Sequence, residues 1–209
     1  AQSVWLWRDG SASMDYASTA ALEPKRDRAE VLLMALAVLL VQGGERVALL
    51  GSGVRPASGR VVLSRLAGQL GNADTATSSL PAAESLPRHA RVVLIGDFLS
   101  PLPEVKATIA AFDALGVRGH MIQVLDPAEE TLPFSGRVRF FGPEAEGEAL
   151  IGRAETTAAD FTRAMAAHQA GLADLARRAG WGFLRHRTDR APQAALLALY
   201  LGLAEPART

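Results

Sequence analysis

The chain has 209 residues, of which 49% are hydrophobic, and Lys plus Arg balance Asp plus Glu at 22 each. Such a chain can bury a sizeable core and is not disordered, and its neutral charge gives no general attraction to nucleic acid or to an anionic membrane. The absence of cysteine excludes disulfides, thiolate metal sites and a cysteine nucleophile.

The first element is an apolar run with two tryptophans, residues 4–7, which predicts a buried strand. Asp9 follows it, and then a Gly-Ser-Ala-Ser segment that favours a turn. Asp9, Ser11 and Ser13 thus place three oxygen side chains at alternate positions near the carboxyl end of a strand, where open α/β sheets bind ligands. One carboxylate and two hydroxyls suit a hard cation such as Mg²⁺, and an ordinary polar turn is the alternative.

The middle of the chain alternates helices and strands. A helix is predicted from Glu23-Pro24-Lys25 to about Gln42, and its apolar run is far shorter than the roughly 20 residues of a membrane span. The other elements expected here are strands at 46–50, 91–95 and 120–125 and helices at 61–70 and 101–115. Short connections between such elements predict an α/β fold with a doubly wound, mainly parallel sheet and helices on both faces.

The later part departs from this alternation. Residues 132–141 and 148–152 flank a Gly-Pro-acidic turn and predict a β-hairpin, inserted at about 132–153. A long helix is expected at 158–179, then a strand at 181–185 and a helix at 192–203 capped by Asp189. No linker divides the chain, so we expect a single domain over residues 1–209. Because the chain starts almost directly in a strand and without Met, we expect the natural protein to continue upstream.

A second acid, Asp97, directly follows the strand predicted at 91–95. A metal site beside Asp9 needs oxygen ligands from other strand ends, and Asp97 has the position to supply one. Asp97 could instead cap the next helix, or fill both roles.

The string Asp9-x-Ser11-x-Ser13-Met14 resembles the metal-ion-dependent adhesion site of von Willebrand factor A domains. Further motifs extend the resemblance over nearly the whole chain, and these lie at residues 94–99, 124–130, 132–137, 167–168, 180–181 and 186–189. As an ordered set they are similar to one bacterial branch of that superfamily, a family of unknown function encoded beside MoxR-type AAA+ ATPases.

The resemblance implies a von Willebrand A or Rossmann-like sheet, a Mg²⁺ or Mn²⁺ site, and a role as adaptor or partner of a MoxR-type ATPase. The metal ligands that it implies are Asp9, Ser11, Ser13, Asp97 and a threonine of the polar loop, Thr75. Thr77, in the same loop, is the alternative to Thr75.

Two positions depart from the family pattern. Arg8 replaces an apolar residue just before Asp9, and its charge could bond to that carboxylate or repel a metal. Gly96 stands where the family often has serine, which removes a hydroxyl from beside Asp97.

An ion held by two carboxylates and neutral hydroxyls stays positively charged and can accept a carboxylate from another protein. We therefore expect a non-enzymatic, metal-dependent protein-binding module. We also expect it in the cytoplasm and without a nucleic-acid partner. A magnesium-dependent phosphohydrolase that uses Asp9 and Asp97 is the alternative, with Asp15 as the nearest candidate for a general base. A degenerate site that binds partners without metal is the third reading.

Overall fold

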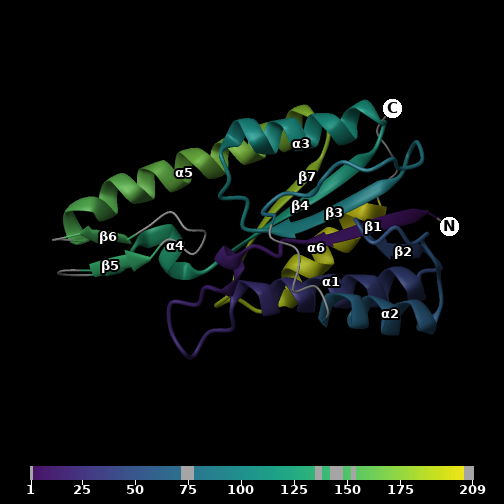
Figure 1. Cartoon of the computed structure of the whole chain (residues 1–209), viewed down its shortest axis with the longest axis horizontal. Coiled ribbons are helices and arrows are strands. Elements are labelled where there is room, and N and C mark those ends of the chain that lie inside the picture. The colour runs from purple at the N-terminus through teal and green to yellow at the C-terminus, as the bar shows by residue number, and fades with distance from the viewer. Residues whose placement is uncertain (1, 72–77, 135–137, 142–147, 152–153, 205–209) are drawn as a thin grey trace.

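A computed structural model of the chain describes residues 2–71, 78–134, 138–141, 148–151 and 154–204. Five strands form one sheet in the order β2-β1-β3-β4-β7, and every neighbouring pair is parallel (Figure 1). The strands are β1 (Ser3–Arg8), β2 (Arg46–Leu49), β3 (Arg91–Gly96), β4 (Arg118–Leu125) and β7 (Gly182–Arg187). The predicted fold class, a parallel α/β sheet of the doubly wound kind, is confirmed.

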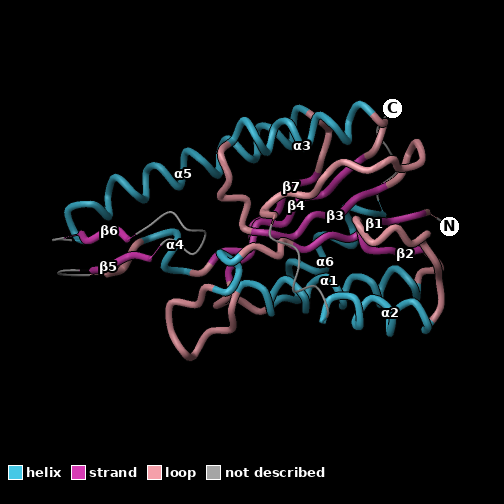
Figure 2. Tube along the Cα trace, viewed as in Figure 1, coloured by secondary structure: helices cyan, strands magenta, loops and turns pink. Residues whose placement is uncertain are grey.

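Helices cover both faces of this sheet, as Figures 1 and 2 show. One face packs against α1 (Lys25–Gln42), α2 (Arg60–Gly71) and α6 (Pro192–Ala204). The other packs against α3 (Leu102–Ala114) and α5 (Ala154–Arg178). Side chains alternate between the two cores along each strand, so that Leu6 faces the first and Trp5 the second.

The helix α1 begins and ends where the sequence predicts. Pro24 sits at its amino-terminal cap, where the missing N–H costs nothing, and Gly43 follows its last residue. Its buried residues recur at helical spacing on the side that faces the sheet, and they are Lys25, Ala29, Leu32, Leu33, Leu36, Ala37 and Leu40. All of them but Lys25 are apolar.

The strand order reverses between β1 and β3. From β1 the chain first adds β2 on one side, and it then crosses back to add β3, β4 and β7 on the other. In sheets of this kind the helices on the two sides of the reversal diverge, which leaves room for a ligand at the carboxyl ends of the two strands. The segments after Arg8 and after Gly96 therefore meet at the one point of the sheet that topology favours for binding.

Several details differ from the sequence-based expectation. A short helix, α4 (Pro127–Thr131), and a 3₁₀ turn at Ala12–Asp15 were not predicted. The strands β5 (Val138–Phe141) and β6 (Glu148–Ile151) form a separate antiparallel pair inside the predicted insertion. Asp189, which was expected to cap the last helix, lies before α6, whose first residue is Pro192, and it binds Arg187 instead, with Oδ2 2.6 Å from Nη2.

Within the described parts of the chain, no helix combines the length and the apolar character of a membrane span.

Candidate functional site

Asp9 and Asp97 lie side by side at the reversal point. The backbone N–H of Asp9 donates to the carbonyl of Ile95 at 2.8 Å, which extends the β1–β3 pairing to the residue that carries the carboxylate. Asp9 is 0% exposed and Asp97 1%. A Cβ on Gly96 would stand only 2.8 Å from the Cβ of Asp9, so the glycine is what lets the Asp9 side chain occupy this position. Gly96 thus makes room for the first acid.

A row of close oxygen contacts joins the two carboxylates. Asp9 Oδ1 accepts the backbone N–H of Ser11 at 2.8 Å and lies 2.6 Å from Ser11 Oγ. Ser11 Oγ lies 2.9 Å from Ser13 Oγ, and Ser13 Oγ donates to Asp97 Oδ2 at 2.7 Å. We call these four residues, Asp9, Ser11, Ser13 and Asp97, the rim site.

The row needs one hydrogen more than the two serine hydroxyls provide. Its three oxygen–oxygen contacts require three hydrogens, while two hydroxyls supply two. A proton on Asp9 would complete the row, and burial together with the nearby charge of Asp97 raises the pKa of Asp9 to about 7. Asp9 Oδ2 is buried without a hydrogen-bond partner among the described residues. A proton on Asp9 therefore satisfies the row, and the unpartnered Asp9 Oδ2 remains available to a further ligand.

Lys25 contributes a cation that sequence reasoning did not assign to the site. Its side chain is completely buried, and Nζ donates to Asp97 Oδ2 at 2.8 Å and to Glu129 Oε1 at 2.5 Å. Burial acts to lower the pKa of Lys25, but Asp97 and Glu129 together raise it above its usual range, so the ammonium stays charged. Burial raises the pKa of Glu129, and the charge of Lys25 opposes that change.

Glu129 is held in place by the first turn of α4. Asp126 Oδ1 accepts the backbone N–H of Ala128 at 2.8 Å, while Glu129 Oε2 accepts the backbone N–H of Asp126 at 2.9 Å. This reciprocal pair is a capping box, and it leaves Glu129 Oε1 directed at Lys25. Asp126 Oδ2 also accepts the backbone N–H of Ser18 at 2.9 Å, so the same cap fixes the loop that leads into α1.

The alternative role for Asp97, as the cap of the next helix, is wrong. α3 starts at Leu102 with Pro101 at its cap, and Asp97 Oδ1 accepts instead from the backbone N–H of Leu99 at 3.2 Å. Gln123 Nε2 donates to the Asp97 carbonyl at 2.9 Å. The carboxylate is therefore oriented toward the rim site by a local turn and by the neighbouring strand.

Arg8 turns away from the Asp9 carboxylate. Its Nε lies 3.4 Å from Glu30 Oε1 on α1, and its Nη1 donates to the backbone carbonyl of Asp9 at 3.1 Å. Asp15, the candidate general base, is bound by Arg26 at 2.6 and 3.0 Å. Neither charged residue enters the rim site.

The structure thus brings together four of the five predicted ligands. Thr75, like its alternative Thr77, lies outside the described residues. Within the described chain, no cluster of three or more His, Cys, Asp or Glu side chains is arranged to hold a metal ion. The rim site has two carboxylates and two hydroxyls, an oxygen set that fits a hard ion such as Mg²⁺ and that includes the unpartnered Asp9 Oδ2. Asp97 Oδ2, one of these oxygens, also accepts from Lys25 Nζ.

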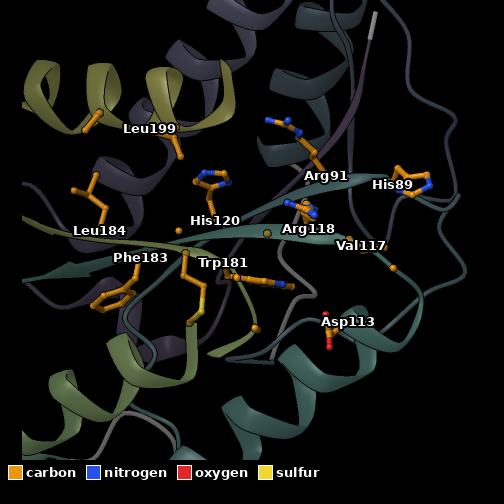
Figure 3. Close-up of a pocket in the computed structure, with 18 residues that line it drawn as sticks. His89, Arg91, Asp113, Val117, Arg118, His120, Trp181, Phe183, Leu184 and Leu199 are labelled. Atoms are coloured by element: carbon orange, nitrogen blue, oxygen red, sulfur yellow. The ribbon is translucent and has the colours of Figure 1, made fainter. Parts of the chain in front are cut away.

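A cavity of about 830 Å³ lies at the opposite end of the sheet (Figure 3). It is lined at the start of β3 and β4 by Arg91, Arg118 and His120, with Trp181 on the other side of the strands. Because the rim site lies at the carboxyl ends of the strands, this cavity is not part of it.

Comparison with known proteins places the chain among uncharacterised relatives. Residues 1–171 match a protein family described as "Protein of unknown function DUF58". Uncharacterized proteins of Mycobacterium bovis and Mycobacterium tuberculosis are 33% identical to the chain over 207 residues, 90% of this chain and 62% of each relative. The chain thus spans less than two thirds of those proteins.

Two solved structures share the fold. The conserved hypothetical protein BatB from Bacteroides thetaiotaomicron superposes with a TM-score of 0.54 at 15% identity, covering 98% of each chain. An aerotolerance-related membrane protein from Bacteroides fragilis gives 0.52 at 14% identity, covering 97% of this chain and 100% of that one. At such low identity the likeness concerns the fold alone.

Proposed function

This chain belongs to the DUF58 family of proteins of unknown function, and we propose that it is a metal-ion-dependent protein-binding module. The observation that carries the proposal is the meeting of Asp9 and Asp97 at the reversal point of the sheet, joined by the hydroxyls of Ser11 and Ser13. These four residues would hold Mg²⁺ or Mn²⁺ with two carboxylates and two neutral hydroxyls. The ion would remain electrophilic toward a carboxylate from another protein.

The partner that we propose is a MoxR-type AAA+ ATPase, with the module acting as its adaptor in the assembly or activation of a protein complex. Support for this step comes from the motif resemblance described above, to a family encoded beside such ATPases. The von Willebrand A-like character of the fold and a cytoplasmic location belong to the same proposal.

Binding is favoured over hydrolysis by the surroundings of the rim site. A metal-dependent phosphohydrolase needs a base within hydrogen-bond reach of the attacking water. Asp15, the nearest candidate in sequence, is exposed and occupied by the Arg26 guanidinium. Asp9 and Asp97 would both be engaged by the ion.

The experiment is a binding measurement with the MoxR-type ATPase of the same genome, immobilised and probed with this protein in Mg²⁺ and then in EDTA. We expect association in Mg²⁺ only, and its loss in Asp9→Ala. The control is Asp113→Ala, which removes an exposed carboxylate far from the rim site. Association that survives both EDTA and Asp9→Ala would contradict the proposal. Turnover of p-nitrophenyl phosphate that disappears in Asp9→Ala would support the hydrolase instead.

A further inference from the structure

Lys25 suggests how the rim site is regulated, an inference that rests on the proposed function. We propose that its ammonium is a tethered counter-cation that competes with the divalent ion for Asp97. When the ion binds, Glu129 keeps the ammonium. The site would thus exchange an internal cation for an external one, with Glu129 on α4 as the acceptor of the displaced ammonium.

The first argument is that Lys25 and the ion need the same atom. Asp97 Oδ2 accepts from both Ser13 Oγ at 2.7 Å and Lys25 Nζ at 2.8 Å. Asp97 Oδ1 is engaged by the backbone N–H of Leu99. An ion coordinated by Ser13 and Asp97 therefore meets the Oδ2 atom that the ammonium holds, and two cations at this spacing repel each other in a buried site.

The second argument is that the ammonium has somewhere else to go. A buried charge without a partner is strongly destabilising, so a lysine with a single partner could not release it. Lys25 has a second carboxylate, Glu129, within hydrogen-bond distance. The side chain is a flexible stem of four carbons on the first residue of α1, so Nζ can leave Asp97 without movement of the helix.

The third argument is that Glu129 is fixed independently of Lys25. Its Oε2 is bound to the backbone N–H of Asp126 in the capping box, so its Oε1 remains in place when the ammonium shifts. The same α4 packs against α5 and leads toward the β5–β6 pair (Figure 1). Glu129 therefore offers a fixed acceptor for the ammonium both before and after the ion binds.

A purely structural role for Lys25 makes the opposite prediction about metal binding. If Lys25 only holds Asp97 in position, its removal must weaken metal binding. If Lys25 competes with the ion, its removal must strengthen it. The sign of the change separates the two roles.

The experiment is calorimetric titration of Mg²⁺ and Mn²⁺ into wild type, Lys25→Met, Glu129→Gln and the control Lys106→Met. Lys106 is the only other lysine of the chain and lies exposed on α3. We expect Lys25→Met to lower the dissociation constant of the divalent ion by about tenfold or more, a typical size for coupling between two ligands. We expect Glu129→Gln to weaken it, because the displaced ammonium loses its second partner, while glutamine still serves in the capping box. Lys106→Met should behave as wild type.

A melting measurement in EDTA adds a readout that does not depend on metal. There Lys25→Met should melt below both wild type and Lys106→Met, since Asp97 and Glu129 are left buried without their cation. Added Mg²⁺ should raise its melting temperature more than that of wild type. Lys25→Met that binds Mg²⁺ no more tightly than wild type overturns the inference alone. Failure of every variant to bind metal overturns the proposed function as well. Metal binding by Lys25→Met but not by wild type supports the inference and means that the wild-type protein does not function through a bound metal.

Discussion

Asp9 is the residue on which the rim site depends, because its carboxylate begins the hydrogen-bonded row and keeps one oxygen without a partner among the described residues. Its environment opposes a negative charge: burial is the main cause and the charge of Asp97 the second, and together they raise its pKa to about 7. A proton, Lys25 and a divalent ion are therefore alternative ways to balance the same cluster of carboxylates. In our proposal, this competition determines how readily a metal can bind.

The raised pKa of Asp9 predicts how stability depends on pH in the metal-free protein. The folded state holds a proton on Asp9 up to about pH 7, whereas an unfolded aspartate releases it near pH 4. The contribution of Asp9 to the free energy of unfolding is thus largest at low pH and is lost as the pH rises from about 4 to about 7. Urea denaturation in EDTA across this range should show that slope in wild type and not in Asp9→Asn.

Wild type must be compared with Asp9→Asn because His186 changes the stability with pH in the opposite direction. Burial and the charge of Arg28 lower the pKa of His186 from the ordinary 6.5 to about 4. The contribution of His186 to the free energy of unfolding is therefore lost as the pH falls from about 6.5 to about 4. His186 is unchanged in Asp9→Asn and cancels in the difference. Parallel stability curves for wild type and Asp9→Asn would contradict the account of Asp9.

Gly96 gives a steric prediction at the same site. In Gly96→Ala the new methyl would lie 2.8 Å from Asp9 Cβ, so the Asp9 side chain must shift. We expect a loss of about 1–3 kcal/mol in the free energy of unfolding and weaker Mg²⁺ binding, measured by denaturation and calorimetry. The control is Gly68→Ala on α2, where a Cβ meets nothing within 4 Å. In a helix this change should raise stability by about 0.5–1 kcal/mol, and equal effects at the two glycines would contradict the steric argument.

The two acids of the rim site could be predicted from the sequence, and the lysine could not. Asp9 and Asp97 each follow an apolar strand directly, and parallel strands bring their carboxyl ends to one edge. Lys25 stands at a helix start, where a lysine is an ordinary surface residue. Only the tertiary structure places it between the carboxylate of Asp97, after β3, and that of Glu129, on α4. The spacing from Asp126 to Glu129 did contain a capping box, which with Pro127 in the first turn was a local signal of α4.

Among the secondary-structure elements, α1 shows where pattern alone is insufficient. Its apolar residues run almost continuously through 31–41, so the sequence predicts a core helix but not which side faces the sheet. In the structure Leu33 is completely buried, whereas Val31 is 47% exposed. The face is set by the position of α1 between the sheet, α2 and α6, which no local signal defines.

Substitutions on α1 test this orientation. Leu33→Ala should lower the free energy of unfolding by about 2–5 kcal/mol, because it leaves a cavity in the core beneath β1. Val31→Ala removes a similar apolar side chain from the exposed side and should change stability by less than about 1 kcal/mol. Chemical denaturation of both proteins measures the difference. Losses of equal size would mean that the helix is rotated from the orientation described here.

For the molecule as a whole, the sheet topology decides where function can lie. Alternating strands and helices were enough to predict a parallel sheet with two covered faces, because each face must bury its apolar side chains. A doubly wound sheet contains a reversal of strand order, but its position between β1 and β3 follows from tertiary packing and was not part of the prediction. That reversal is what makes Asp9 and Asp97 neighbours.

Metal binding at the reversal point predicts a gain in stability of the whole domain. An ion that binds only the folded state at a concentration of 100 times its dissociation constant adds about 2.7 kcal/mol to the free energy of unfolding. For a chain of this size such a gain raises the melting temperature by roughly 5–10 °C. Calorimetric melting of wild type should show this shift with Mg²⁺, and Asp9→Ala should show none. An equal shift in both proteins would place the ion elsewhere.

The most direct measurement is the anomalous diffraction of crystals soaked in Mn²⁺. The account predicts one strong peak bounded by the carboxylates of Asp9 and Asp97 and the hydroxyls of Ser11 and Ser13, with the Lys25 ammonium moved from Asp97 onto Glu129. A map without a peak among these side chains, with Lys25 Nζ still bonded to Asp97 Oδ2, would contradict it.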